Sequence, residues 1–181
     1  MYTSIIATVL AAAVIKAAPT STGSIFPSRT VPLTRVTHSV VAGRAGQLIF
    51  DPQNVVAQVG DIVEWHFLPM NHSVAQSSFG SPCVPDADVS TSFFSGFQPT
   101  TSGQAPNVFQ FIVKDSNPIW YYCAQGNHCE SGMAGVINQN FSSANTLDAY
   151  KAKAKTVQKT VIPPVVQGGA VIPNPNPLGG F

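Results

Sequence analysis

Short runs of β-branched and aromatic residues, each ended by a turn residue, are the feature that most limits how this chain can fold. The clearest runs read HSVVAG, QLIFDPQNVVAQVGD, DIVEWHF, STSFFSGF, NVFQFIVKD, IWYYCA and AGVINQN. The 181 residues include 15 prolines and 14 glycines, which favour short strands joined by turns over helices. We therefore expect one all-β domain, a sandwich or barrel of about seven or eight short strands.

The run DIVEWHF shows the alternation of a strand that is buried on one face. Val63, Trp65 and Phe67 fall on one face, and Ile62, Glu64 and His66 fall on the other. We place the first face in the core and His66 at an outer, solvated position. The three phenylalanines of STSFFSGF, at positions 93, 94 and 97, are also interpreted as core residues rather than as a partner-binding patch.

The two ends differ in composition from the middle. An apolar run within residues 1–18, followed by small residues and Pro19, is typical of a secretory signal peptide, and residues 19–35 form a Ser/Thr/Pro-rich linker or pro-segment. Residues 36–140 form the β domain. In residues 141–181 we expect a weak surface helix and then a disordered Pro/Gly-rich tail, without a hydrophobic run of lipid-anchor type and without a transmembrane span.

The net charge of +1 conceals an acidic middle and basic ends. Residues 36–140 contain two basic side chains, Arg44 and Lys114, against seven acidic ones: Asp51, Asp61, Glu64, Asp86, Asp88, Asp115 and Glu130. This balance gives no case for nucleic-acid binding. The acidic middle is either a solvated surface that aids solubility or a docking face for a basic redox partner.

The stretch WYYCAQGNHCESGM contains a cysteine, a histidine and a methionine in the spacing C-x4-H-x4-M, as Cys123, His128 and Met133. A further histidine, His72, follows an earlier strand-like run. Two imidazoles and a thiolate with a weak axial thioether are the ligands of a type 1 copper site. Coincidence in a β-rich core is the alternative, since methionine and lone cysteine are common core residues.

Local chain geometry explains how one loop could supply three ligands. Cys123 ends a strand-like run, in which Tyr121 shares its face, and Gly126 with Asn127 then turns the chain so that His128 can return toward it. Gly132 permits a second bend before Met133, and AGVIN resumes as the next strand. We expect His72 to approach from a neighbouring loop.

Cysteine pairing follows from the ligand assignment but is not settled by it. If Cys123 binds copper as a thiolate, Cys83 and Cys129 remain as a disulfide pair. The rival pair, Cys83 with Cys123, would consume the ligand sulfur and leave Cys129 as an odd thiol, and the sequence does not exclude it. We favour Cys83–Cys129.

The stretches NHSVAQSSFGSPC and PIWYYCAQGNHCESGMAGVIN, together with VGDIVEWHF, resemble the cupredoxin (blue copper) family. The chain is most similar to phytocyanins and to secreted, serine-rich fungal proteins with one cupredoxin domain. The resemblance covers about residues 37–140 and implies a Greek-key β-sandwich with one type 1 copper ion at one end. His72, Cys123, His128 and Met133 are its implied ligands.

The function we expect is that of a secreted, monomeric one-electron carrier that cycles Cu(II)/Cu(I). The alternative is an extracellular or cell-wall module in which copper is structural or scavenged, acting in adhesion or copper handling. An enzyme is not expected: the sequence has no His-x-His pair for a multicopper oxidase and none of the P-loop, nucleophile-elbow or His-Glu-x-x-His motifs. Of two glycosylation sequons, Asn140 is the better acceptor, because Asn71 adjoins a ligand.

Overall fold

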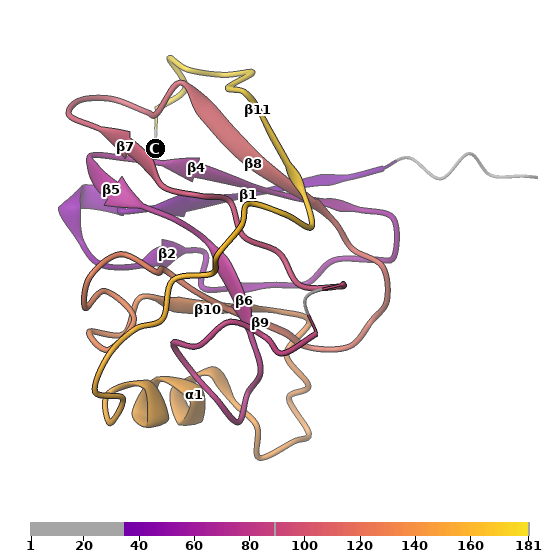
Figure 1. Ribbon diagram of the computed structural model, residues 1–181. Helices are drawn as coiled ribbons and strands as arrows, with labels where there is room; N and C mark the ends of the chain where they lie inside the picture. Colours follow the sequence, from indigo (N-terminus) through magenta and orange to yellow (C-terminus); the bar gives the residue numbers. More distant parts are fainter. Residues whose placement is uncertain (1–34, 89, 181) are drawn as a thin grey trace, which may run out of the picture. The chain divides into compact units, whose positions relative to one another are not determined.

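The computed structural model describes residues 35–88 and 90–180 (Figure 1). The expected signal peptide and all of the expected linker except Arg35 lie outside these residues. Among the described residues there are eleven strands, one α-helix and one short 3-10 helix. The number of strands exceeds the seven or eight expected from sequence, because several strands contain only two or three residues.

The larger sheet has five strands in the order β11-β8-β4-β1-β2. Their bounds are β1 Thr37–Ala42, β2 Phe50–Asp51, β4 Ile62–Phe67, β8 Asn107–Ile112 and β11 Ala170–Pro173. β1 runs parallel to β4, with Thr37 opposite Ile62, and the other neighbours are antiparallel. The first strand of the domain therefore lies in the interior of its sheet.

The second sheet has four strands in the order β3-β10-β9-β6, and a separate pair is formed by β5 and β7. The bounds are β3 Asn54–Val55, β5 Met70–His72, β6 Ala75–Ser77, β7 Gln98–Thr100, β9 Ile119–Tyr122 and β10 Ala134–Ile137. β10 pairs antiparallel with β9 and parallel with β3. The 3-10 helix η1, Arg44–Gly46, lies in the turn between β1 and β2.

The main core lies between the two sheets, and Trp65 of β4 is at its centre. The Trp65 ring centroid is 5.3 Å from that of Tyr121 on β9, across the sandwich, and 5.5 Å from that of Phe93. Val63, Trp65 and Phe67 are fully buried in this core, so the alternation in DIVEWHF was interpreted correctly for that face. Phe93 and Phe94 are also buried and Phe97 is half-buried, as expected for core residues.

The helix expected after residue 140 is α1, Leu147–Ala154. Thr146 caps its N-terminus, since the Thr146 Oγ1 accepts from the Ala149 N–H at 3.2 Å. Tyr150 is fully buried, and its ring is stacked on that of Trp120 at 5.5 Å with an interplanar angle of 8°. The helix is thus anchored to the outer face of the second sheet by an aromatic pair. None of the described helices has the length and apolar character needed to cross a membrane.

The C-terminal segment corrects the expectation of a disordered tail. Val161 N–H donates to the Cys83 carbonyl at 2.8 Å, and Gln167 exchanges backbone hydrogen bonds with Phe94. The chain then enters the larger sheet as β11, antiparallel to β8 (Figure 1). Composition predicted disorder because the segment is rich in Pro and Gly, but its backbone groups find partners along an otherwise open sheet edge.

His66 was expected to be solvated, and the structure shows this to be wrong. It shares a face with Glu64 as predicted, but His66 is 2% exposed and Glu64 is 5% exposed. His66 Nε2 is 2.8 Å from Glu64 Oε1, and His66 Nδ1 is 2.8 Å from Gln104 Oε1. Gln104 is in turn held by the C-terminal residues, because its Nε2 donates to the carbonyls of Asn176 and Gly179. The C-terminal segment therefore covers the face of β4 that the alternation of residues had assigned to solvent.

Replacing His66 by alanine should destabilise the domain strongly. The Glu64 carboxylate would keep its bond from Gln110 Nε2 at 2.6 Å but lose its buried imidazole partner. Removing one member of a buried pair costs about 3–5 kcal/mol, measurable by urea unfolding. The pair between His38 and Asp61, in which the His38 side chain is 27% exposed, provides the control. A loss for His38→Ala as large as that for His66→Ala would contradict the role assigned to burial.

Candidate metal centre

The loop between β9 and β10 folds as the glycine positions predicted. Gly126 and Gly132 have φ angles of +49° and +98°, a region that favours glycine. The loop is closed by backbone bonds: Cys123 N–H donates to the Met133 carbonyl at 3.1 Å, and Met133 N–H donates to the His128 carbonyl at 2.9 Å. Cys123, His128 and Met133 are therefore fixed relative to one another by the backbone itself.

Three of the four predicted ligand residues converge on one point. One donor atom from each of His72, Cys123 and His128 lies within 4.8 Å of the other two. The Cys123 Sγ is 3.9 Å from His72 Nδ1 and 3.4 Å from His128 Nδ1. His72 arrives from the end of β5 and Cys123 from the end of β9, so two separate loops meet here.

The fourth predicted residue, Met133, lies in the same core cluster as Cys123 and is fully buried. Its backbone is held against Cys123 by the bond described above, at the start of β10. Its role as a ligand stays a prediction.

Burial sets the protonation of the donors. Desolvation, and then the charge of His128, lowers the pKa of His72 to about 4. Burial also lowers the pKa of His128, although the charge of Glu130 opposes this. Both imidazoles are consequently neutral at pH 7, with a ring nitrogen free to bind a metal. Burial raises the pKa of the Cys123 thiol, which hydrogen bonds from the backbone of Gln125 and Ser73 partly offset.

Ser73 orients the sulfur of Cys123. Its backbone N–H donates to Cys123 Sγ at 3.4 Å, and its Oγ lies 4.0 Å from the same sulfur. The Ser73 Oγ also accepts from the Ala124 N–H at 3.0 Å. Ser73 therefore ties the strand end that supplies His72 to the strand end that supplies Cys123. Hydrogen bonds of this kind orient metal ligands and tune the metal.

Two further contacts position the site, and sequence reasoning missed both. Asn71 Nδ2 donates to Gln125 Oε1 at 2.9 Å, so a second side-chain bond joins the two loops. Gly43, in the β1–β2 turn, gives the His72 ring its space: a Cβ at Gly43 would lie 2.5 Å from His72 Nε2. Neither the turn at Gly43 nor its contact with a residue 29 positions away could be inferred from local pattern.

Cys83 and Cys129 form the disulfide, with a Cα–Cα distance of 5.6 Å, and Cys123 is a free, buried cysteine. Of the two pairings left open by the sequence, the structure has the one that spares Cys123. The C-terminal segment reinforces this side of the loop, because Glu130 Oε1 accepts from the Thr160 N–H at 2.6 Å and Glu130 Oε2 from the Thr160 hydroxyl at 2.5 Å. The sequence did not predict this contact between Glu130 and Thr160.

The residues present fit a copper ion. The two Nδ1 atoms face one free sulfur in a buried cluster, and the glycine at position 43 leaves room for the first imidazole. Thiolate with two imidazoles is the equatorial donor set of a type 1 copper centre, and soft sulfur selects copper over hard cations. The fold and this cluster together define a β-sandwich metalloprotein with a single His2Cys site among the described residues.

Comparison with known proteins gives the family. Over 134 residues the chain is 34% identical to the protein named "Probable GPI-anchored cupredoxin-1" of Arthroderma benhamiae, covering 74% of this chain and 67% of that protein. The chain therefore belongs to the cupredoxin family. It is also 36% identical over 135 residues to an "Extracellular serine-rich protein" of the same fungus, covering 75% of this chain but only 51% of that one. The chain thus spans about half of the length of that relative.

Among solved structures, auracyanin A of Chloroflexus aurantiacus, a blue copper protein, is similar with a TM-score of 0.42 and 16% identity, over 57% of this chain and 97% of that one. A scan against family models found no match.

Replacing Gly43 by alanine should weaken metal binding. The new Cβ would displace the His72 ring, in addition to a cost of about 1–2 kcal/mol for its φ of +87°. Gly46→Ala is the matched control, since Gly46 has a φ of +71° but nothing within 4 Å of its Cβ position. We expect copper affinity to fall by about tenfold or more in Gly43→Ala, measured by competition with a chelator, and to change little in Gly46→Ala. Equal affinities in the two variants would show that His72 does not depend on Gly43.

Replacing both Cys83 and Cys129 by serine should lower stability without removing the donors. The bridge closes a loop with a sequence separation of 46 residues, for which chain entropy predicts a loss of about 3–4 kcal/mol. Because Cys123 is outside the bridge, the variant should still bind copper below its lowered melting temperature. Loss of copper binding by a variant that remains folded would indicate that the bridge shapes the site itself.

Proposed function

We propose that the chain is a type 1 copper protein that carries single electrons, with His72, Cys123, His128 and Met133 as the ligands. The observation that carries the proposal is the convergence of His72 Nδ1 and His128 Nδ1 on the free sulfur of Cys123. When bound there, copper would supply reversible Cu(II)/Cu(I) chemistry. The protein's own contribution is to hold both imidazoles neutral and the sulfur oriented, so that little needs to move between the two oxidation states.

His128 is the proposed point at which electrons enter and leave. His72 and Cys123 are fully buried, whereas His128 is half-buried and follows two exposed residues, Gly126 and Asn127. A partner that docks over Gly126 and Asn127 would come closer to the metal site than a partner that docks over either sheet. Four protein ligands would leave no open position for a substrate, which supports a carrier over an oxidase.

Secretion is part of the proposal. It is supported by the apolar run within residues 1–18 and by two relatives that are named extracellular and GPI-anchored. In that compartment Asn140 is the proposed glycan acceptor, because its side chain is exposed. Asn71 is half-buried and uses its Nδ2 to bind Gln125, so a glycan there would disrupt the contact between the two loops. We assign residues 19–35 to a linker and residues 36–140 to the cupredoxin domain, whose larger sheet the C-terminal segment joins as β11.

Copper that is structural or scavenged on a cell surface is the second candidate, favoured by the surface-related names of the two relatives. Optical spectroscopy separates the candidates. A carrier should show an intense visible absorption when loaded with Cu(II), bleached reversibly by ascorbate. A colourless copper complex, or one that ascorbate does not bleach, would favour the structural role.

Replacing Cys123 by serine should abolish the intense absorption, because the thiolate is its source, while the fold persists. Replacing Met133 tests the axial position separately. Leucine there should leave the colour and raise the reduction potential, and glutamine should lower the potential, because its harder oxygen stabilises Cu(II). Cyclic voltammetry with absorption spectra measures both. A Cys123→Ser protein that stayed blue would refute the ligand assignment, and a potential insensitive to residue 133 would remove Met133 from it.

A further inference from the structure

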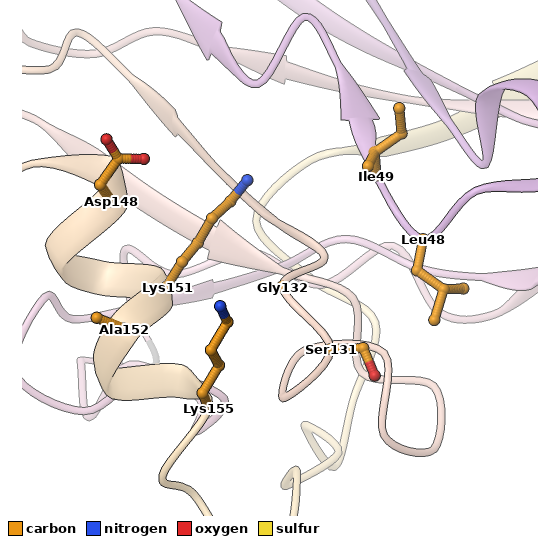
Figure 2. Close-up of a pocket in the computed structure, with 8 residues that line it drawn as sticks. All are labelled: Leu48, Ile49, Ser131, Gly132, Asp148, Lys151, Ala152 and Lys155. Carbon is orange, nitrogen blue, oxygen red and sulfur yellow. The ribbon is translucent and has the colours of Figure 1, made fainter.

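A pocket of about 370 Å3 lies between the ligand loop and α1 (Figure 2). It is lined by Leu48 and Ile49 from the β1–β2 connection, Ser131 and Gly132 from the ligand loop, and Asp148, Lys151, Ala152 and Lys155 from α1. The volume falls within the range of about 300–1,000 Å3 that is usual for small-molecule sites. Ser131 and Gly132 immediately precede Met133, so an occupant would touch the loop that carries three of the proposed ligands.

Two lysines give the pocket its charge. Figure 2 shows the side chains of Lys151 and Lys155 both extending from the helix on the side of the pocket, with the Lys151 ammonium directed away from Ser131 and the Asp148 carboxylate at the start of the helix. Within the described parts of the chain, no ion pair closer than 4.0 Å includes either lysine. Lys151 Nζ donates to a neutral acceptor, the Gln53 Oε1. A Lys ammonium has three donors, so donors remain for a further ligand.

Burial is the main cause that lowers the pKa of Lys151. The charge of Asp148 opposes this, and the like charge of Lys155 lowers the pKa by a smaller amount. An anion placed between the two ammonium groups would relieve the repulsion between them and replace water that Lys151 has lost. Leu48 and Ile49 form an apolar wall opposite the helix, which lowers the local dielectric and strengthens such an interaction.

We propose that this pocket binds a small oxyanion, such as phosphate, sulfate or a carboxylate, between Lys151 and Lys155. The two lysines act as point charges on the anion, the role that lysine has in phosphate sites. Three chain segments line the pocket, namely the β1–β2 connection, the ligand loop and α1, and its volume suits a small free anion better than a flat acidic protein surface.

The anion would also regulate the copper site, a step that rests on the proposed function. Negative charge beside the ligand loop favours the more positive Cu(II) state, so an occupied pocket lowers the reduction potential. Coupling between two sites is reciprocal, so the oxidised protein binds the anion more tightly than the reduced protein. The ratio of the two affinities sets the size of the potential shift.

Titration of the metal-free full chain with inorganic phosphate tests the pocket independently of copper. We expect saturable shifts of the Ser131 and Gly132 amide signals in NMR spectra, and a dissociation constant weakened by about tenfold, or about 1.4 kcal/mol, in Lys151→Met/Lys155→Met. Lys153→Met is the matched control: it removes the same charge from the same helix, but the Lys153 ammonium lies 4.1 Å from the centroid of the Phe79 ring. Its affinity should change by less than about twofold.

Several results would overturn the assignment. If phosphate binding did not saturate, or if Lys153→Met weakened it as much as Lys151→Met/Lys155→Met, the binding would be only a diffuse attraction of anions to a basic helix. Tighter binding of a short oligoglutamate than of phosphate at the same lysines would assign the pocket to an acidic protein surface. Because Lys151→Met also loses the bond to Gln53, the single variant Lys155→Met, at an exposed position, is measured as well and should weaken binding in the same direction.

The copper-loaded protein tests the coupling. Added phosphate should lower the reduction potential of the wild type and leave that of Lys151→Met/Lys155→Met unchanged. Binding without any potential shift would refute the regulatory step while leaving the pocket. A protein that binds phosphate but shows no blue copper would refute the proposed function and not the pocket.

Discussion

The sulfur of Cys123 is the point on which the structure around the site depends. It lies at the end of β9, where the loop that carries His128 begins, and it receives the backbone N–H of Ser73 from the loop that carries His72. The backbone bond between Cys123 and Met133 closes the first loop, and the Ser73 hydroxyl joins it to the second. The donors are therefore held in place by hydrogen bonds within the protein.

Bringing these donors together removes them from water, and the loss of hydration shifts their pKa values. The buried thiol, the buried imidazole of His72 and the half-buried imidazole of His128 lose hydration, which is why the pKa of Cys123 is raised and those of the histidines are lowered. Neutral donors cost less to bury in a hydrophobic core than charged ones would. The same neutrality leaves the imidazole nitrogens free for a metal ion, so one physical condition serves both stability and binding.

Much of the fold could be predicted from local pattern, because alternation and turn residues act over a few positions. The alternation in β4 placed Val63 and Trp65 in the core, and the spacing of Gly126 and Gly132 gave the shape of the ligand loop. The cluster of His72, Cys123 and His128 was anticipated because donor chemistry restricts which residue types can gather around one ion. Local pattern could not reveal what Gly43 contacts, or that the chain after α1 returns to bury His66. Both depend on segments that are distant in sequence.

The two edges of the larger sheet are not equivalent. One edge is β2, a strand of two residues that offers little backbone for pairing, and the other is β11, which covers β8 over the register Ala170–Pro173. β8 reads NVFQFI and combines aromatic with β-branched residues, a composition prone to pairing with other chains when its backbone is open. β11 therefore protects the edge of β8. Without β11, all the proposed copper ligands would still be present, but the open backbone of β8 would make the molecule prone to aggregation.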